Sequence, residues 1–138
     1  MPGPGKKRRT GCPIAFGLDT FGDRWTLLII RDILLRDCKT YGDFLEAGEG
    51  IATNILADRL KQLEQFDIIT KSRDPKNRRR YLYRLTEKGL DLTPVLLEMV
   101  RWSFKYDPDT IAGRAFVKRI ERDRDGIAGE LRARLAGN

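Results

Sequence analysis

Histidine is absent from the 138-residue sequence, and cysteine occurs only at positions 12 and 38. Without histidine, neither a histidine-dependent catalytic triad nor a histidine metal site can form. The spacing of Cys12 and Cys38 fits neither a CxxC redox pair nor a zinc-knuckle pattern, and it implies no disulfide framework. We therefore expect a protein that is not an enzyme and that has no catalytic residue, metal site or cofactor.

Long apolar runs are absent too. The run from Trp25 to Ile30 is interrupted by Thr26 and is far shorter than the ~20 residues that cross a bilayer. The basic N-terminus is followed by no apolar stretch before Cys12, which argues against a secretory signal. We expect a cytoplasmic protein that does not interact with membranes.

Positive charge is present in excess and is unevenly distributed. The chain has 27 basic and 20 acidic residues, a net charge of +7. Residues 1–10 contain four bases and no acid, and residues 71–84 contain seven bases and one acid. Such concentration favours a polyanionic partner, of which nucleic acid is the commonest. A charged face that is simply solvated is the alternative.

The pattern of apolar residues predicts a mostly helical protein with one pair of strands. Residues 1–11 are rich in Gly, Pro, Lys and Arg, a composition typical of a flexible arm. Beyond them, apolar residues recur first at helical spacing and later in short β-prone runs. We expect helices over residues 13–21, 24–35, 41–46, 53–66, 86–106 and 107 to the C-terminus, the last interrupted near 123–126, and strands over 68–73 and 80–85 joined by residues 74–79.

Capping signals support several of these boundaries. Asp23 can cap the helix at 24–35, and Thr40 with Asp43 can form a capping box for the next one. Asp107, followed by Pro108, would begin the last helix. Helices followed by a two-stranded hairpin form a winged helix-turn-helix, so we expect a mainly α fold with a β-hairpin wing (α+β).

In a winged helix the second helix of the motif, here residues 53–66, lies in the major groove of duplex DNA. Its outer face begins with two uncharged polar residues, and an asparagine amide can both donate to and accept from adenine. A lysine further along suits a phosphate. The alternative is an ordinary amphipathic helix with a polar outer face. The predicted DNA contacts on this helix are Thr53, Asn54, Asp58, Arg59 and Lys61.

The hairpin carries the stronger signal. Four bases, Lys76, Arg78, Arg79 and Arg80, lie within five residues at its tip, where they repel one another unless a polyanion compensates. We predict that they contact the DNA backbone or enter a narrow minor groove. Strand alternation prevents Arg78 and Arg80 from pointing the same way as Arg79. As an alternative, Arg80 pairs with an acid of the protein body.

Four motifs in order resemble the HxlR-type regulators, winged-helix proteins related to the MarR group. They are Cys12-Pro13, residues 21–32 (FGDRWTLLIIRD), residues 50–64 (GIATNILADRLKQLE) and residues 83–89 (YRLTEKG). The resemblance implies an HxlR-type domain over residues 12–106 and a helical extension over 107–138 that takes part in dimerisation. It also implies a homodimeric DNA-binding transcriptional regulator. Ala52 departs from the cap residue of many relatives, so Thr53 is a candidate for that cap.

The two cysteines have different expected surroundings. In some members of this family the Cys-Pro position serves as a thiol sensor, and a helix start near basic residues favours thiolate chemistry. Cys12 is therefore a candidate redox sensor, the alternative being a small interface residue. Cys38 lies in a polar loop, where we expect it to be exposed.

Homodimerisation is also indicated by apolar residues that one reading unit cannot cover. These are Ile14, Phe16, Leu18, Leu96, Leu97, Val100, Trp102, Phe104, Phe116, Ile120 and Leu131. A two-fold dimer predicts an inverted-repeat operator. No ligand-binding motif identifies a small-molecule or oxidant effector.

Two other functional classes compete with DNA binding. The hairpin could instead bind protein or RNA, although the sequence lacks the paired aromatics typical of single-stranded RNA sites. An enzyme would need paired carboxylates, but Asp19, Asp23, Asp32 and Glu64 have plainer roles as caps or surface charges. We therefore expect a repressor whose helix 53–66 lies in the major groove and whose wing, residues 74–80, lies on the backbone or minor groove.

Overall fold

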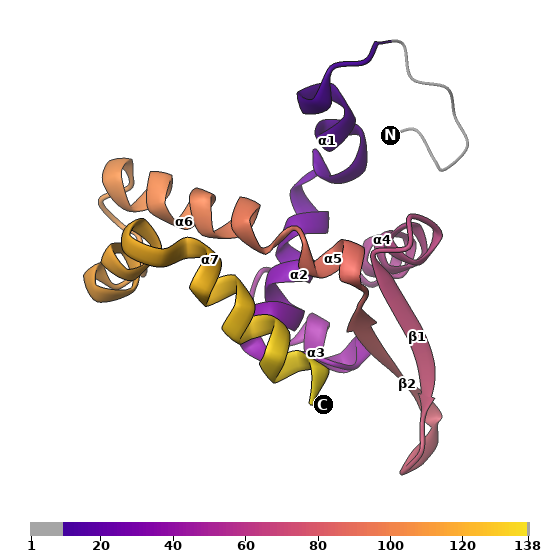
Figure 1. Ribbon diagram of the computed structural model, residues 1–138. Helices are drawn as coiled ribbons and strands as arrows, with labels where there is room; N and C mark the ends of the chain where they lie inside the picture. The colour runs from indigo at the N-terminus through magenta and orange to yellow at the C-terminus, as the bar shows by residue number, and fades with distance from the viewer. Residues whose placement is uncertain (1–9, 138) are drawn as a thin grey trace. The chain divides into compact units, whose positions relative to one another are not determined.

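The computed structural model describes residues 10–137 and is mostly helical (Figure 1). The basic residues at positions 6–9 of the predicted arm lie outside the described residues. The elements, in chain order, are α1 (Pro13–Phe21), α2 (Arg24–Arg36), α3 (Tyr41–Leu45), α4 (Thr53–Gln65), β1 (Ile69–Asp74), β2 (Asn77–Leu85), α5 (Glu87–Leu90), α6 (Thr93–Tyr106) and α7 (Arg114–Ala136). This is the predicted mainly α fold with a two-stranded wing. None of the described helices is long and apolar enough to cross a membrane.

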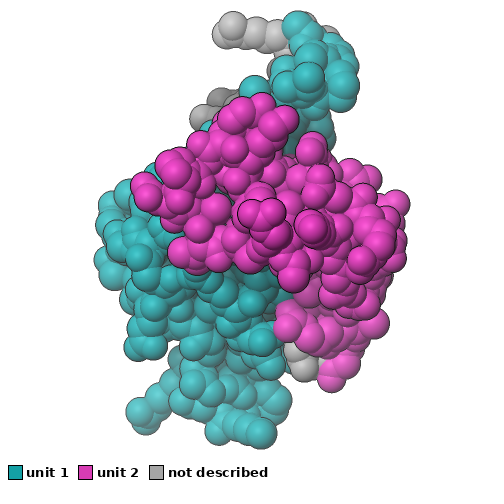
Figure 2. All heavy atoms as spheres, turned by 90° about the vertical axis from the view of Figure 1, so that its left-hand side faces the viewer, with its two compact units in different colours: residues 1–89 teal, residues 90–138 magenta. Residues whose placement is uncertain are grey.

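Two compact units divide the chain, residues 1–89 and residues 90–138, and Figure 2 colours them separately. The first unit contains α1 to α4 and the hairpin, and the second contains α6 and α7. The division into a 12–106 domain and a 107–138 extension stays a prediction.

The core of the first unit gathers the apolar sides of three helices and the base of the hairpin. The edge of the Phe44 ring meets the ring of Tyr83, with centroids 5.9 Å apart. The Tyr83 amide donates to the Lys39 carbonyl over 2.8 Å, which fastens β2 to the α2–α3 loop. The buried apolar residues of this core include Ile29, Ile30, Ile33, Leu34, Phe44, Leu56, Leu60, Leu63, Ile68, Ile69 and Tyr83.

Two of the predicted N-terminal caps in this unit are confirmed. The Asp23 carboxylate accepts hydrogen bonds from the Trp25 and Thr26 amides at the start of α2. Thr40 and Asp43 form the capping box of α3. Local side-chain chemistry therefore sets both helix starts.

The hairpin is longer and its turn tighter than expected. β1 and β2 pair antiparallel. The register shifts between Arg73, which lies opposite Tyr81, and Asp74, which lies opposite Asn77. Pro75 and Lys76 alone form the turn. The expectation of a six-residue connection over 74–79 was wrong, because Arg78 and Arg79 continue strand β2 despite their charge.

The second unit differs from the predicted boundaries in two places. The expected helix over 86–106 is divided into α5 and α6. Asp107 ends α6 instead of capping a new helix, and α7 begins at Arg114. The predicted interruption of the last helix is confirmed at Asp123, whose backbone is non-helical with φ −156° and ψ 64°.

Part of the apolar surplus assigned to the dimer surface is used inside the second unit. Leu97, Ile120 and Ile127 form a buried core between α6 and α7, with Val100, Phe116 and Leu131 packed against it. Leu96 is buried as well. Exposed apolar side chains remain, among them Ile14, Phe16, Leu18, Met99, Trp102, Tyr106 and Ile111.

Asp23 links two helices of the first unit, because its carboxylate also accepts from the Arg59 guanidinium of α4 over 2.8 Å. Burial disfavours the charged form, but hydrogen bonds from Thr26, Arg59 and the two capped amides outweigh burial and lower the pKa of Asp23. We expect Asp23→Ala to lower the free energy of unfolding by about 2 kcal/mol, as the loss of an N-cap does. Urea denaturation measures this.

The pKa of Asp23 is lower in the folded protein than its ordinary value of 3.8, so its contribution is complete at neutral pH. That contribution is lost as the pH falls below 3.8 through the folded-state value, and the two proteins should then converge in stability. Asp58→Ala is the control, because it removes only the exposed partner of Arg59 and should cost less than about 1 kcal/mol. Equal losses in both variants would contradict the assignment.

Candidate nucleic-acid interface

Helix α4 presents a polar face to solvent. Its buried residues, Leu56, Leu60 and Leu63, recur every three or four positions and face the core. The other side of the helix is therefore left outward. The exposed side chains predicted to contact DNA on this helix are Thr53, Asn54, Asp58 and Lys61, which we call the reading face.

Thr53 does not cap α4. The N-cap is Ala52, which has no side-chain cap hydrogen bond, and Thr53 is the first helical residue. The Tyr41 hydroxyl donates to the Thr53 carbonyl over 2.9 Å, so a contact from α3 holds the start of the helix. The expectation that Thr53 replaces the missing cap was wrong, and its exposed hydroxyl is not used for capping.

Arg59 is turned towards the protein more than the other predicted contacts on α4. Its Nε donates to Asp23 over 2.8 Å and its Nη1 donates to Asp58 over 2.5 Å. The guanidinium thus joins α4 to the N-terminus of α2. A DNA contact by Arg59 or Asp58 stays a prediction.

The wing, strands β1 and β2, has a carboxylate inside its turn. Asp74 is 4% exposed and accepts from the Lys76 amide over 2.9 Å. It also accepts from Arg80, over 3.0 Å from Nε and 2.7 Å from Nη2. The hydrogen bond from Arg80 and then that from the Lys76 amide lower the pKa of Asp74. Arg80 therefore pairs with an acid, as the alternative proposed, but the acid belongs to the hairpin and not to the protein body.

Two bases that were not among the predicted DNA contacts lie along β1. Lys71 and Arg73 are placed over the Tyr81 ring, with the Lys71 Nζ 4.2 Å and the Arg73 Cζ 4.8 Å from the ring centroid. Arg73 also donates to the Arg78 carbonyl over 2.5 Å. Alternation along β1 puts residues 71 and 73 on one face, and this signal was available from the sequence.

The tip of the wing therefore carries bases of two kinds. Arg73 and Arg80 are exposed too, but they also donate hydrogen bonds within the hairpin, to the Arg78 carbonyl and to Asp74. Lys76, Arg78 and Arg79 are exposed, and we call them the wing tip. A rigid support that presents exposed bases is suited to a polyanion whose charges lie at fixed spacing.

The two cysteines differ in exposure. Cys12 is exposed and is the N-cap residue of α1, where it makes no side-chain cap hydrogen bond. Cys38 is buried, contrary to expectation, and its Sγ lies 3.8 Å from the Asp43 carbonyl oxygen. Burial, followed by the nearby carboxylates of Asp32 and Asp43, raises the pKa of Cys38 to about 11. Its thiol is therefore poorly suited to react.

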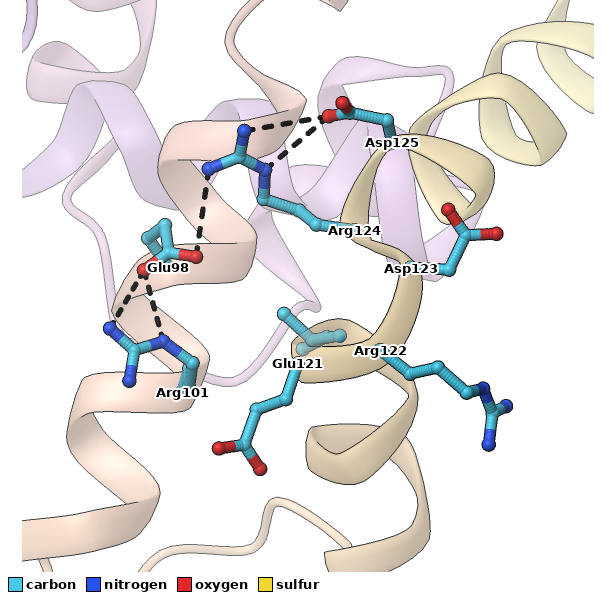
Figure 3. Close-up of a pocket in the computed structure, with 8 residues that line it drawn as sticks. Glu98, Arg101, Glu121, Arg122, Asp123, Arg124 and Asp125 are labelled. Carbon is cyan, nitrogen blue, oxygen red and sulfur yellow. Dashed lines mark hydrogen bonds and ion pairs between the residues drawn. The ribbon is translucent and has the colours of Figure 1, made fainter.

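A charged hollow of about 550 Å³ lies beside the interruption of α7 (Figure 3). Glu98 of α6 receives Arg101 over 3.0 Å and Arg124 over 3.6 Å, and Arg124 also reaches Asp125 over 3.4 Å. These charged side chains are therefore paired with one another, and the ion pair between Glu98 and Arg124 connects α6 to α7. Within residues 10–137 no cluster of three or more Cys, Asp or Glu side chains could hold a metal ion.

The sequence relatives of this chain include HTH-type transcriptional regulators. The HTH-type transcriptional regulator YodB of Bacillus subtilis is 37% identical over 100 residues, covering 70% of this chain and 87% of YodB. The uncharacterized HTH-type transcriptional regulator sll1512 of Synechocystis is 35% identical over 88 residues, and the match spans 64% of the length of each protein.

Solved structures agree with these relatives. Reduced YodB superimposes with a TM-score of 0.58 and 32% identity, covering 73% of this chain and 99% of that one. YodB has also been solved in diamide-treated and quinone-bound forms. A protein of Porphyromonas gingivalis assigned to the MarR family gives a TM-score of 0.63 at 30% identity, covering 73% of this chain and 98% of that one.

A family model described as HxlR-like helix-turn-helix matches residues 20–110, which include α2 to α6 and the whole wing. The matched segment contains both the reading face and the wing tip. The chain belongs to the HxlR-like helix-turn-helix family of transcriptional regulators.

Proposed function

We propose that this regulator binds an inverted repeat in duplex DNA as a homodimer and represses transcription there, acting in the cytoplasm. The observation that carries the proposal is the pairing, in one compact unit, of an outward polar helix face with a braced basic hairpin. A dimer bound across a promoter represses by excluding the transcription machinery.

The reading face suits the major groove. The groove is about 12 Å wide and admits an α-helix. Thr53 and Asn54 are both exposed in the first turn of α4, where recognition helices contact base edges. The Asn54 amide can pair with N6 and N7 of adenine, and Lys61 is placed about two turns further along for a phosphate.

The wing tip suits the backbone and the minor groove. Lys76, Arg78 and Arg79 are exposed, and the ion pair between Arg80 and Asp74 fixes the strand that carries two of them. Because the wing is already ordered by these contacts, little conformational entropy is lost when it binds. Binding by the wing should therefore add affinity for DNA of any sequence.

Dimerisation is supported by apolar side chains that the chain itself leaves exposed. On α1, Ile14 is 72% and Leu18 59% exposed, and on α6, Trp102 is 63% and Tyr106 61% exposed. Large apolar patches on a soluble monomer mark interaction surfaces. A second copy of the chain that covers these helices would give two reading faces related by a two-fold axis.

An oxidant-responsive regulator is the second candidate, and Cys12 carries it. The thiol is exposed, and YodB, a relative, has been solved in diamide-treated and quinone-bound forms. Oxidation of Cys12 would change the start of α1, which bears part of the proposed dimer surface.

The first prediction concerns the wing tip. In the double variant Arg78→Ala/Arg79→Ala, affinity should fall for all duplex sequences, because two phosphate contacts are lost. The slope of log K against log salt should become shallower by roughly 2, about one unit for each contact. Fluorescence anisotropy at several salt concentrations measures the slope. Lys118→Ala/Arg122→Ala removes the same charge from α7 and should leave it unchanged, so equal slopes in the two variants would sink this assignment.

The second prediction concerns base reading. Asn54→Ala should lose about 1–3 kcal/mol of binding free energy on an operator selected from a random duplex library, and little on random DNA. Lys61→Ala is the matched control and should weaken both DNAs alike, since a phosphate contact carries no sequence information. If Asn54→Ala also weakens both equally, then Asn54 is not a base-reading residue.

The third prediction concerns the dimer surface. Leu18→Glu and Trp102→Glu should each weaken self-association and operator binding together, because a buried unpaired charge opposes the interface. Sedimentation equilibrium at micromolar concentration measures the association. Gln65→Glu adds the same charge at the exposed end of α4 and should leave the dimer intact. A wild-type chain that stays monomeric while binding its operator tightly contradicts the dimer.

The fourth prediction concerns Cys12. Diamide, which couples two thiols into a disulfide and is itself reduced to the hydrazine, should join the Cys12 thiols of two chains and lower the operator affinity of the wild-type protein, and it should leave Cys12→Ser unaffected. Cys38→Ser should respond like the wild type, because the Cys38 thiol is buried. An undiminished response in Cys12→Ser would show that Cys12 is not the sensor. The proposal that the protein binds DNA would not be affected.

A further inference from the structure

The turn between α3 and α4, residues 46–52, has little intrinsic rigidity. Gly48 and Gly50 adopt left-handed backbone angles, with φ of 97° and 72°, and no atom lies near the position of a Cβ at either residue. Glycine is the residue that adopts such angles readily, and it is also the most flexible. The chain that leads into the reading face therefore needs other contacts to fix it.

The start of α4 does not supply those contacts itself. Ala52 has no side chain that could bond to the first amides, so the usual local restraint at an N-cap is missing. Thr53 and Asn54 follow directly after this uncapped position. Conformational variation in the turn would therefore displace the two residues that are proposed to read bases.

Helix α2 holds the turn from the other side. Nη1 of Arg31 donates to Glu49 Oε1 over 2.9 Å, and Glu49 lies between the two glycines. Nη1 of Arg36 donates to the Ala47 carbonyl over 2.6 Å, and Arg24 lies 3.8 Å from Glu49. The turn thus has one charged anchor and one backbone anchor on the same helix.

The charged anchor is itself fixed. Arg31 is 17% exposed at its side chain, and its Nε and Nη2 donate to Asp32 Oδ1 over 3.0 and 2.8 Å. Asp32 is 4% exposed, so it holds the guanidinium in one orientation. The hydrogen bond from Arg31, followed by its positive charge, lowers the pKa of Glu49.

We propose that the hydrogen bond from Arg31 to Glu49 is a positioning device for DNA sequence specificity, which sets the place of Thr53 and Asn54 on the scaffold. Neither Arg31 nor Glu49 is proposed to contact a base. Glu49 fixes the turn, and Arg31 holds Glu49 in place. The inference rests on the proposed DNA-binding function. Loss of the pair should blur base reading while leaving phosphate contacts by the wing intact.

The test uses two substitutions at Glu49 that separate its hydrogen bond from its charge. Glu49→Gln keeps an oxygen that can accept from Arg31 but removes the charge, and Glu49→Ala removes both. Glu46→Gln is the control for charge, because Glu46 is an exposed acid of the same turn. Affinities of the full-length variants are measured for the selected operator duplex and for a random duplex.

We expect Glu49→Ala to lower the ratio of operator to random affinity by roughly 3- to 20-fold, the range in which indirect residues modulate coupled sites. Glu49→Gln and Glu46→Gln should keep the wild-type ratio. If Gln and Ala at position 49 raise affinity for both duplexes equally, Glu49 acts only by repelling phosphates and the proposal is wrong. The proposal is equally wrong if Glu49→Ala keeps the ratio.

A second readout on the free protein separates this inference from the proposed function. The Leu56 amide donates to the Ala52 carbonyl over 2.9 Å at the start of α4, and the Phe66 amide donates to the Gln62 carbonyl at its end. In Glu49→Ala, hydrogen exchange should accelerate at Leu56 and not at Phe66. Unchanged exchange at Leu56 overturns the positioning role even if DNA binding stands. If exchange at Leu56 is faster in Glu49→Ala but the wild-type protein prefers no operator, the Arg31–Glu49 contact still positions α4, and the proposed function is wrong.

Discussion

The carboxylate of Asp23 is the group on which the geometry of the reading unit depends. It accepts from the Trp25 and Thr26 amides over 3.0 and 3.1 Å, from the Thr26 hydroxyl over 2.5 Å and from Arg59 over 2.8 Å. One side chain thereby starts α2 and ties α4 to it. The pair is partly shielded from water, so it is screened less than an exposed ion pair. The helix that carries the reading face is thereby held against α2.

Several arginines of the first unit form ion pairs with acids of that unit. Arg59, Arg31 and Arg80 each bind an acid of the same unit, namely Asp23, Asp32 with Glu49, and Asp74. The bases that remain exposed on the wing tip are carried by a strand whose own arginine is neutralised. The Arg31 and Arg59 side chains are 17% and 24% exposed, whereas the Arg80 side chain stays 52% exposed beside its ion pair.

Local chemistry made much of the fold predictable. The capping residues Asp23 and Thr40, the helical spacing of α4 and the change of period at the hairpin all follow from neighbours within a few positions. The α7 start was misplaced because Asp107-Pro108 resembles an N-cap signal, whereas Asp107 is the C-cap of α6. Cys38 was misjudged since its burial depends on packing around a polar loop.

The candidate site was predictable as a set of residues but not as a set of roles. The sequence predicted Arg59 and Arg80 as DNA contacts but not their ion pairs with Asp23 and Asp74. Arg59 and Asp23 are far apart in the chain, so no local pattern could reveal that pair. The link between Arg31 and Glu49 likewise joins α2 to a distant turn, and only the folded arrangement brings it to notice.

We propose above all that two copies of this chain read a symmetric site in duplex DNA. Selection of the wild-type protein against a random-sequence duplex library, followed by sequencing, tests it most directly. We expect enrichment of an inverted repeat whose half-sites are centred about one helical turn, ~10–11 base pairs, or a small multiple apart. Recovery of no preferred sequence, or of a single asymmetric site, would contradict it.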